Sequence, residues 1–192
     1  MRSYLLLFIG SAVTIILDQI TKVWAVEKLL VPTGPLPADA HMIRTRVDVV
    51  FESWFNYRLA GNKGAAFGLF RDLPEGMRVP FFLVICIIAV VAITVMYRKS
   101  HGQKLFQVSL TLILGGAIGN LIDRIRYGYV VDFIDWFYKD YHWPTFNVAD
   151  IAITSGVILM VIDMFINKEF HSGGNTAASS SDEQGENAPS GS

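Results

Sequence analysis

Charged residues are scarce in this sequence. Asp, Glu, Lys and Arg make up 17% of its 192 residues, whereas hydrophobic residues make up 52%. A soluble domain carries roughly a quarter charged residues, so the composition predicts a membrane protein. The formal net charge of -1 excludes a broadly basic nucleic-acid-binding protein, so no nucleic acid is expected as a partner.

Cysteine and clustered histidine are also lacking. Cys86 is the one cysteine of the sequence, which excludes an intrachain disulfide, a CxxC redox pair and a cysteine-rich zinc site. The four histidines are scattered and no HExxH motif occurs. A Ser-His-Asp triad is therefore not expected, and neither is a metal or another cofactor.

Long apolar segments are what the sequence has in abundance. Val79 to Tyr97 is 19 residues without a charge, and Leu105 to Ile122 is 18. At about 1.5 Å per residue, each nearly covers a hydrocarbon core of roughly 30 Å. Two shorter segments become long enough when polar residues at their ends are included. The predicted spans are residues 4–24, 79–97, 105–122 and 148–166.

The segments outside the spans differ in character. From Ile43 to Leu59 apolar and polar residues alternate, which predicts strands with one apolar face in a β region over residues 43–70. The loop from Asp132 to Asn147 is rich in aromatics, as in an interfacial belt. The Gly/Ser-rich segment 171–192 cannot bury a core and is expected to be a disordered tail. Residues 1–170 then form one membrane-embedded domain.

Four spans place both termini on the same side of the membrane. The short loop holding Arg98, Lys99 and Lys104 contains no acid, which favours a cytoplasmic position. The first loop, residues 27–78, holds seven basic residues, so raw counting favours the opposite orientation. We give more weight to the dense loop beside the helix ends and expect both termini in the cytoplasm.

Ionisable and amide residues within or beside the spans are costly in a membrane and usually functional. With both termini inside, those of the first, third and fourth spans converge on the outer layer of the membrane. Asn62 and Lys63 reach the same layer from the first loop. The convergent residues within and between the spans are Asp18, Lys22, Asn120, Asp123, Arg124, Asp132, Asn147 and Asp150.

Two carboxylates held close together can hydrolyse a peptide bond. One keeps a proton because both cannot ionise comfortably. The ionised one activates a water molecule while the protonated one donates to the scissile carbonyl oxygen. The residues alone leave open which aspartates pair. Asp132 and Asp150 are favoured because neither has an opposite charge adjacent in sequence, whereas Asp18 and Asp123 have Lys22 and Arg124.

Five short motifs stand in order along the chain. They are Asp18-Gln19-x-x-Lys22, Asn62-Lys63-Gly64-Ala65-Ala66-Phe67-Gly68, Gly119-Asn120-x-x-Asp123-Arg124, Val131-Asp132-Phe133 and Phe146-Asn147-Val148-Ala149-Asp150. With them the chain resembles the prolipoprotein signal peptidase family, also called signal peptidase II or lipoprotein signal peptidase. The likeness covers residues 4–166.

The resemblance implies a membrane aspartic endopeptidase of the bacterial inner membrane, with both termini cytoplasmic and the active site toward the extracytoplasmic face. Asp132 and Asp150 match the family's catalytic pair. Asn62, Gly64, Asn120, Arg124 and Asn147 match residues that line the substrate site, with Asp18, Lys22 and Asp123 as supporting residues. The implied substrate is a diacylglyceryl-prolipoprotein, cleaved just before its lipidated cysteine, and membrane lipid is the other expected partner.

The expected fold is therefore an all-α membrane protein: a four-transmembrane-helix bundle, expected to be a monomer, with a small extracytoplasmic β-sheet cradle. The aromatic loop from Trp136 to Trp143 suits the family's mobile lid segment. The alternative function is a small proton- or cation-coupled transporter subunit, since intramembrane carboxylates often carry ions. Polar residues confined to one layer argue against it, because an ion path would line the whole bilayer.

Overall fold

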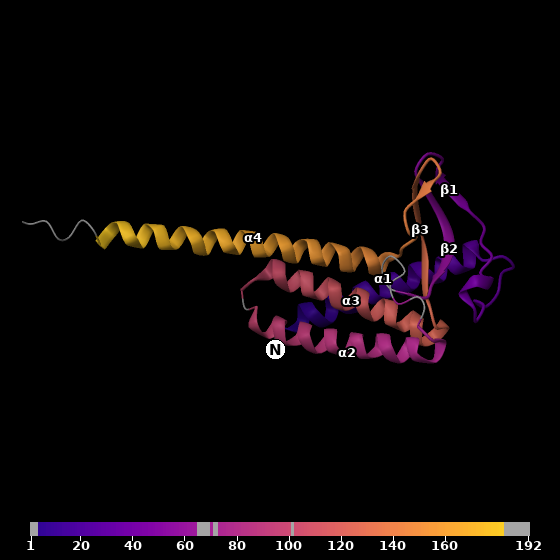
Figure 1. Ribbon diagram of the computed structural model, residues 1–192, viewed down its shortest axis with the longest axis horizontal. Helices are drawn as coiled ribbons and strands as arrows, with labels where there is room; N and C mark the ends of the chain where they lie inside the picture. The colour runs from indigo at the N-terminus through magenta and orange to yellow at the C-terminus, as the bar shows by residue number, and fades with distance from the viewer. Residues whose placement is uncertain (1–3, 65–69, 71–72, 101, 183–192) are drawn as a thin grey trace, which may run out of the picture.

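A computed structural model describes residues 4–64, 70, 73–100 and 102–182 (Figure 1). Four helices dominate it, and each is long and apolar enough to cross a membrane. The prediction of four apolar helices is confirmed, and each helix extends past the predicted span at one end or both. They are α1 (Leu5–Leu29), α2 (Glu75–Lys99), α3 (Lys104–Tyr127) and α4 (Val148–Asp182).

Small residues bring the helices together around α3. A Cβ atom at Gly115 would lie 2.6 Å from Cβ of Thr14 on α1, and one at Gly116 would lie 2.5 Å from the carbonyl oxygen of Ala149 on α4. Only glycine permits such close approach. This is the usual means by which membrane helices associate, since lipid provides no hydrophobic force between them.

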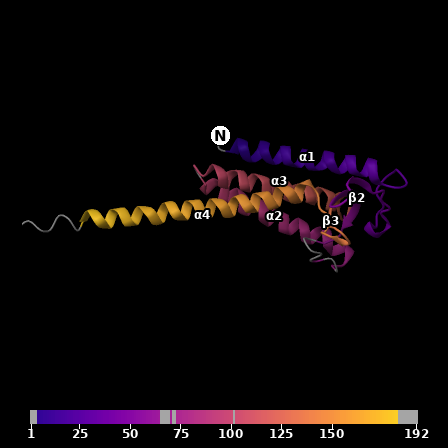
Figure 2. The ribbon, with the colours of Figure 1, turned by 90° about the horizontal axis from the view of Figure 1, so that it is seen from above.

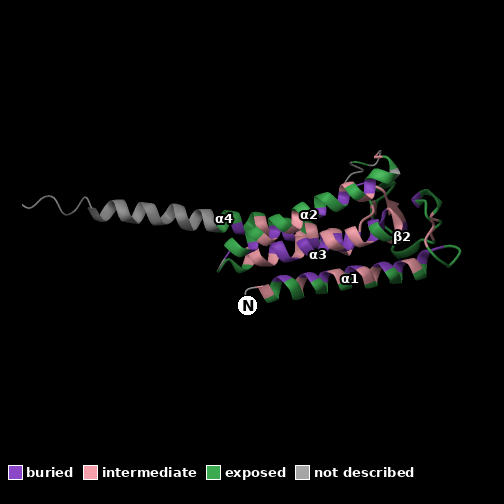
Figure 3. Cartoon of the chain, turned by 90° about the horizontal axis from the view of Figure 1, so that it is seen from below, coloured by how far each residue is buried: buried purple, intermediate pink, exposed green. Residues whose placement is uncertain are grey.

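The outer surfaces of the bundle are apolar. Phe8, Ile88 and Phe165 are 69%, 63% and 68% exposed, and exposed residues follow the outward side of each helix (Figure 3). In a bilayer, lipid chains cover these side chains. The core at the end away from the strands is formed by Leu7, Ile93, Tyr97, Leu110 and Leu114.

A four-stranded antiparallel sheet lies across one end of the bundle (Figures 1 and 2). Its strands follow the order β1 (Asp48–Phe51), β2 (Phe55–Asn62), β3 (Val130–Tyr138) and β4 (Tyr141–His142). The alternation between residues 43 and 59 predicted β1 and β2. The pairing of β2 with β3 places Ala60 opposite Asp132 and Asn62 opposite Val130, so the connection between α1 and α2 and the connection between α3 and α4 form one sheet.

Aromatic side chains join this sheet to the end of α1. The ring of Trp24 meets that of Tyr57 edge-on at 5.1 Å and that of Phe133 at 6.2 Å. Leu29 and Leu59 are buried in the same cluster. By contrast, Val49 on β1 is 55% exposed, so only β2 and β3 use their apolar side chains to hold the sheet on the bundle.

The segment predicted as a lid, Trp136 to Trp143, is a β-hairpin in this structure. Phe137 pairs with His142, and Lys139 takes φ of 54° in the turn. Its base is closed by Phe146, whose N–H donates to the carbonyl of Ile134 at 3.1 Å while its carbonyl accepts from the N–H of Ile134 at 2.9 Å.

The C-terminal part of α4 differs from expectation. The composition predicts disorder over 171–192, but the helix continues to Asp182, and Figure 1 shows it projecting beyond the other helices. Glycine and serine have low helix propensity, but a helix that the span has already nucleated continues into them without a second nucleation cost. Residues 183–192 lie outside the described part of the chain.

Candidate functional site

The two aspartates favoured by the sequence lie on β3 and in the first turn of α4. Asp132 is 2% exposed. Asp150 takes part in a reciprocal cap with Asn147, the residue before α4. The N–H of Asp150 donates to Oδ1 of Asn147 at 3.0 Å, and the N–H of Asn147 donates to Oδ2 of Asp150 at 3.2 Å. This is the capping-box arrangement, which fixes both the helix start and the carboxylate.

One side-chain amide joins the two aspartates. Nδ2 of Asn147 donates to Oδ1 of Asp132 at 2.6 Å, while the rest of Asn147 caps Asp150. The same Nδ2 lies 3.1 Å from Oδ1 of Asn120 on α3. Asn147 therefore connects β3, α3 and α4, and holds the two carboxyl groups on either side of itself.

Asn120 holds the other side of Asp150. Its Nδ2 donates to Oδ1 of Asp150 at 2.8 Å, and its Oδ1 accepts from Nζ of Lys22 at 3.0 Å. A lysine ammonium can only donate, so the oxygen of the amide must face Lys22 and the nitrogen must face Asp150.

Lys22 lies at the centre of a buried charge cluster. Its Nζ is 2.9 Å from Oδ2 of Asp18 and 2.8 Å from Oδ2 of Asp123. Each carboxylate also accepts a backbone N–H: that of Ala149 at 2.9 Å for Asp18, and that of Val131 at 3.0 Å for Asp123. The cluster thus fixes α1 and α3 to the residues beside Asp150 and Asp132.

Arg124 connects α3 to the segment after β2. Its Nη2 donates to the carbonyl of Gly64 at 2.6 Å, and its guanidinium carbon lies 4.0 Å from the ring centroid of Phe82 on α2. The N–H of Gly64 donates to Oδ1 of Asn62 at 3.0 Å, and the side chain of Asn62 also bonds to Asp132. Asn62 and Gly64 therefore border the dyad from the sheet side.

Burial raises the pKa of Asp132 well above its ordinary value. The charge of Asp150 raises it further, while the hydrogen bonds from Asn62 and Asn147 and the charge of Lys22 act in the opposite direction. A carboxyl group that keeps its proton near neutral pH is the requirement for the acid of a two-aspartate mechanism.

All ten residues selected from the sequence gather at the sheet end of the bundle. Besides the two aspartates, five of them are hydrogen-bonded to Asp132, to Asp150 or to the residue that precedes one of these in the chain. The other three are bonded to members of that group. The ten are Asp18, Lys22, Asn62, Gly64, Asn120, Asp123, Arg124, Asp132, Asn147 and Asp150.

Two residues of the site were not selected from the sequence. Gln19, which stands in the first of the five motifs, donates to Oδ1 of Asp123 at 3.0 Å and to Oδ2 of Asp18 at 3.2 Å, and its signal is an amide within an apolar span. Phe82, on which Arg124 stacks, has no signal because it is one apolar residue among many on α2. Within the described ranges, no three His, Cys, Asp or Glu side chains are grouped to hold a metal.

A sequence model described as "Signal peptidase (SPase) II" matches residues 11–166. The chain belongs to the signal peptidase II family. It is therefore a peptidase, and its four apolar helices make it a membrane protein.

Similar proteins from several bacteria carry the name lipoprotein signal peptidase. The one from Maridesulfovibrio salexigens is 40% identical over 169 residues, covering 88% of this chain and all of its own. Those from Geobacter metallireducens and Clostridium tetani are each 40% identical, over 84% and 81% of this chain and 91% and 88% of their own.

Two solved structures resemble this signal peptidase II family member in fold. Both are described as a bacterial membrane enzyme studied by the in meso method, at 2.3 Å and 1.9 Å resolution. Their TM-scores are 0.66 and 0.62, each at 31% identity. They cover 84% and 82% of this chain, and 88% and 91% of their own.

Proposed function

We propose that this chain removes the signal peptide from diacylglyceryl-modified lipoprotein precursors, cleaving just before the lipidated cysteine, with Asp132 and Asp150 as the catalytic pair. The observation that carries the proposal is the bridge between the two carboxyl groups. Asn147 donates to Asp132 at 2.6 Å and forms a reciprocal cap with Asp150. The names of the similar proteins supply the substrate class.

The roles of the two acids follow from their surroundings. Asp132, whose pKa is raised by burial, starts protonated and donates to the scissile carbonyl oxygen. Asp150 is less buried than Asp132 and is therefore the better place for the negative charge of the pair. Hydrogen bonds from Asn120 and from the backbone of Asn147 stabilise that charge. Asp150 takes a proton from the attacking water molecule.

The proton balance then closes within the pair. Water adds to the carbonyl carbon and gives a tetrahedral diol, with Asp150 now protonated and Asp132 ionised. Asp150 passes its proton to the leaving nitrogen while Asp132 recovers one from a hydroxyl of the diol. The C–N bond breaks, and the pair returns to its starting state.

Substrate binding would use the groups that surround the pair. Arg124 donates to the carbonyl of Gly64 at 2.6 Å, and this bond fixes the backbone of Gly64 beside the dyad. Arg124, Asn120 and Asn62 offer donors to peptide carbonyls, while Asp18, Lys22 and Asp123 hold the scaffold. We place the sheet as a cradle for the peptide near its cleavage point, with the hairpin Trp136–Trp143 as the lid.

The orientation proposed is cytoplasmic termini with the dyad at the outer face, in a monomer. Arg98 and Lys99 in the last turn of α2 support it because basic loops favour the cytoplasm. The test uses a Cys86→Ser background. Tyr141→Cys, at the exposed hairpin, should react with an impermeant maleimide in spheroplasts, and Lys99→Cys only after lysis. If Lys99→Cys reacted in spheroplasts and Tyr141→Cys only after lysis, the protein would have the opposite orientation.

The catalytic assignment is tested with purified Asp132→Asn and Asp150→Asn variants and a diacylated precursor peptide. Each should lose at least about a thousandfold in kcat, as acid–base groups acting as a unit do, while still unfolding in one cooperative thermal transition. Asp140→Asn, in the exposed turn of the hairpin, is the matched control and should cleave normally. Turnover retained by either dyad variant would remove that residue from the pair. The unlipidated twin of the peptide should be cleaved far more slowly.

A further inference from the structure

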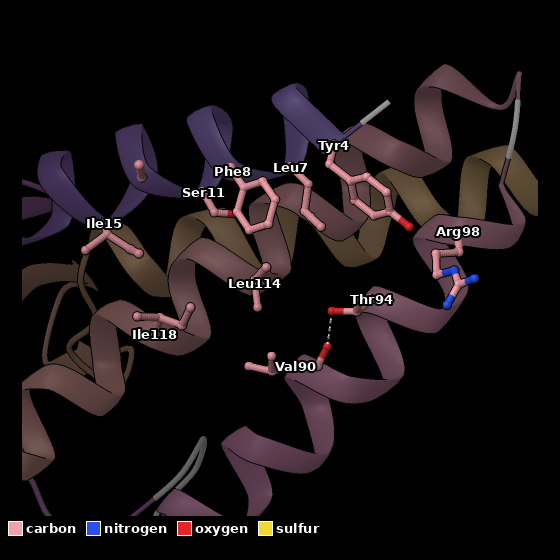
Figure 4. Close-up of a pocket in the computed structure, with 11 residues that line it drawn as sticks. Tyr4, Leu7, Phe8, Ser11, Ile15, Val90, Thr94, Arg98, Leu114 and Ile118 are labelled. Atoms are coloured by element: carbon pink, nitrogen blue, oxygen red, sulfur yellow. Dashed lines mark hydrogen bonds between the residues drawn. The ribbon is translucent and has the colours of Figure 1, made fainter. Parts of the chain in front are cut away.

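A groove runs between α1, α2 and α3 in the half of the bundle away from the sheet. Both α1 and α2 pack on α3 but make few backbone-level contacts with each other. They meet where Tyr4 stacks on Tyr97 at 5.8 Å between ring centroids and where Leu7 packs with Ile93, and a groove is left beside these contacts. Figure 4 shows Leu7, Ser11 and Ile15 on one wall and Val90, Thr94 and Arg98 on the other, with Leu114 between them. Its volume is about 540 Å³.

The dimensions of the groove fit one hydrocarbon chain. Its α1 wall extends from Tyr4 to Ile15, about 16 Å along the helix and about half the hydrocarbon core, so it spans one leaflet. About 540 Å³ over about 16 Å gives a mean cross-section of about 34 Å². A packed helix about 10 Å wide needs more than twice that area, whereas carbon chains pack at about 4 Å.

The charge at one end of the groove suits an anionic headgroup. Arg98 lines the groove at the end away from the sheet, beside Tyr4 (Figure 4). Lys99 follows Arg98 in the last turn of α2, and the sequence from 98 to 104 contains no acidic residue. Arginine is the preferred partner of phosphate because its planar fork donates two hydrogen bonds.

We propose that this groove binds a single anionic phospholipid from the leaflet opposite the sheet. One acyl chain lies between α1 and α2, and the phosphate pairs with Arg98. The site is separate from the aspartate pair, which lies at the other end of the bundle, so it takes a resident lipid and not the substrate. The lipid fills the gap that α1 and α2 leave over α3.

Native mass spectrometry of the detergent-purified protein tests this, with equimolar phosphatidylglycerol and phosphatidylcholine as probes. The wild type should retain phosphatidylglycerol about fivefold more than phosphatidylcholine, and Arg98→Gln should abolish that preference. Ala12→Phe, which fills the groove from an exposed position, should abolish retention of both lipids. The matched controls are Lys99→Gln, on the same helix end, and Val13→Phe, on the lipid-facing side of α1. Both should behave as wild type.

Four results would overturn the proposal. Equal retention of the two lipids by the wild type would deny the role of the phosphate charge. Retention by Ala12→Phe at the wild-type level would place the lipid elsewhere. An equal loss in Lys99→Gln and Arg98→Gln would indicate diffuse surface charge, and a protein dimer in place of bound lipid would assign the groove to a second copy. None of these readouts depends on peptidase activity.

Discussion

The ammonium of Lys22 lies 3.0 Å from Oδ1 of Asn120, and this contact determines which end of the amide faces Asp150. A charge on α1 thereby fixes the direction of a hydrogen bond between α3 and α4. The dyad is therefore positioned from a helix that supplies neither of its acids.

Replacing Asn120 by aspartate tests this orientation. The variant loses the N–H donor to Asp150 and adds a third carboxylate, so we expect kcat to fall about a hundredfold, as for the loss of an oriented donor. A neighbouring negative charge stabilises protonated carboxyl groups. The residual pH–rate profile should therefore move to higher pH. A profile that keeps its position would show that Asn120 does not contact the titrating pair.

Removing the cation of the buried cluster should unfold the protein more easily. Lys22→Met leaves the carboxylates of Asp18 and Asp123 without the cation that pairs with them. Breaking a fully buried ion pair costs about 3–5 kcal/mol. The measurement is thermal unfolding in detergent. Lys28→Met, exposed in the last turn of α1, should leave the transition unchanged. Equal stability of the two variants would contradict the assigned role.

The raised pKa of Asp132 predicts how stability varies with pH. Its neutral form is favoured in the folded state, so its stabilising contribution is present at low pH and is lost as pH rises through the folded pKa. As pH rises above about 4, the ordinary pKa of an aspartate, the wild type should lose stability relative to Asp132→Asn, whose amide does not titrate. Parallel melting curves for the two proteins would argue that Asp132 is ionised throughout.

The close contact between α3 and α4 should be sensitive to one methyl group. In Gly116→Ala the new Cβ would meet the carbonyl oxygen of Ala149 at 2.5 Å, and backbone cannot move aside as a flexible side chain can. Overpacking of this kind costs about 1–3 kcal/mol, and the shift of α4 would displace Asp150 and lower kcat. Gly76→Ala, with no atom within 4 Å of the new Cβ, is the control that should change neither property.

The charge pairs show what sequence spacing can predict. Asp18 and Lys22, four residues apart on one helix, were expected to pair and lie 2.9 Å apart. The sequence places Arg124 next to Asp123 as its opposite charge, but the carboxylate of Asp123 binds Lys22, Gln19 and the N–H of Val131. Adjacent residues on a helix point about 100° apart and do not face each other. Spacing predicts partners within a helix, but partners between helices depend on how the helices pack.

Strand β3 shows where periodicity fails. The alternation of residues 43–59 predicted β1 and β2 because one face of those strands is polar. Residues 130–135 are buried on both faces, so their sequence, VVDFID, does not alternate between apolar and polar residues with a period of two. The sequence selected Asp132 as one of the two paired acids, but it did not predict that Asp132 lies in a strand between β2 and β4.

The backbone bonds between Ile134 and Phe146 close the hairpin just beyond Asp132 and just before Asn147. The turn at Lys139 and Asp140, at the tip of the hairpin, lies beyond this closure. We therefore expect changes in the length and sequence of that turn to leave the distance between the two carboxyl groups unaltered.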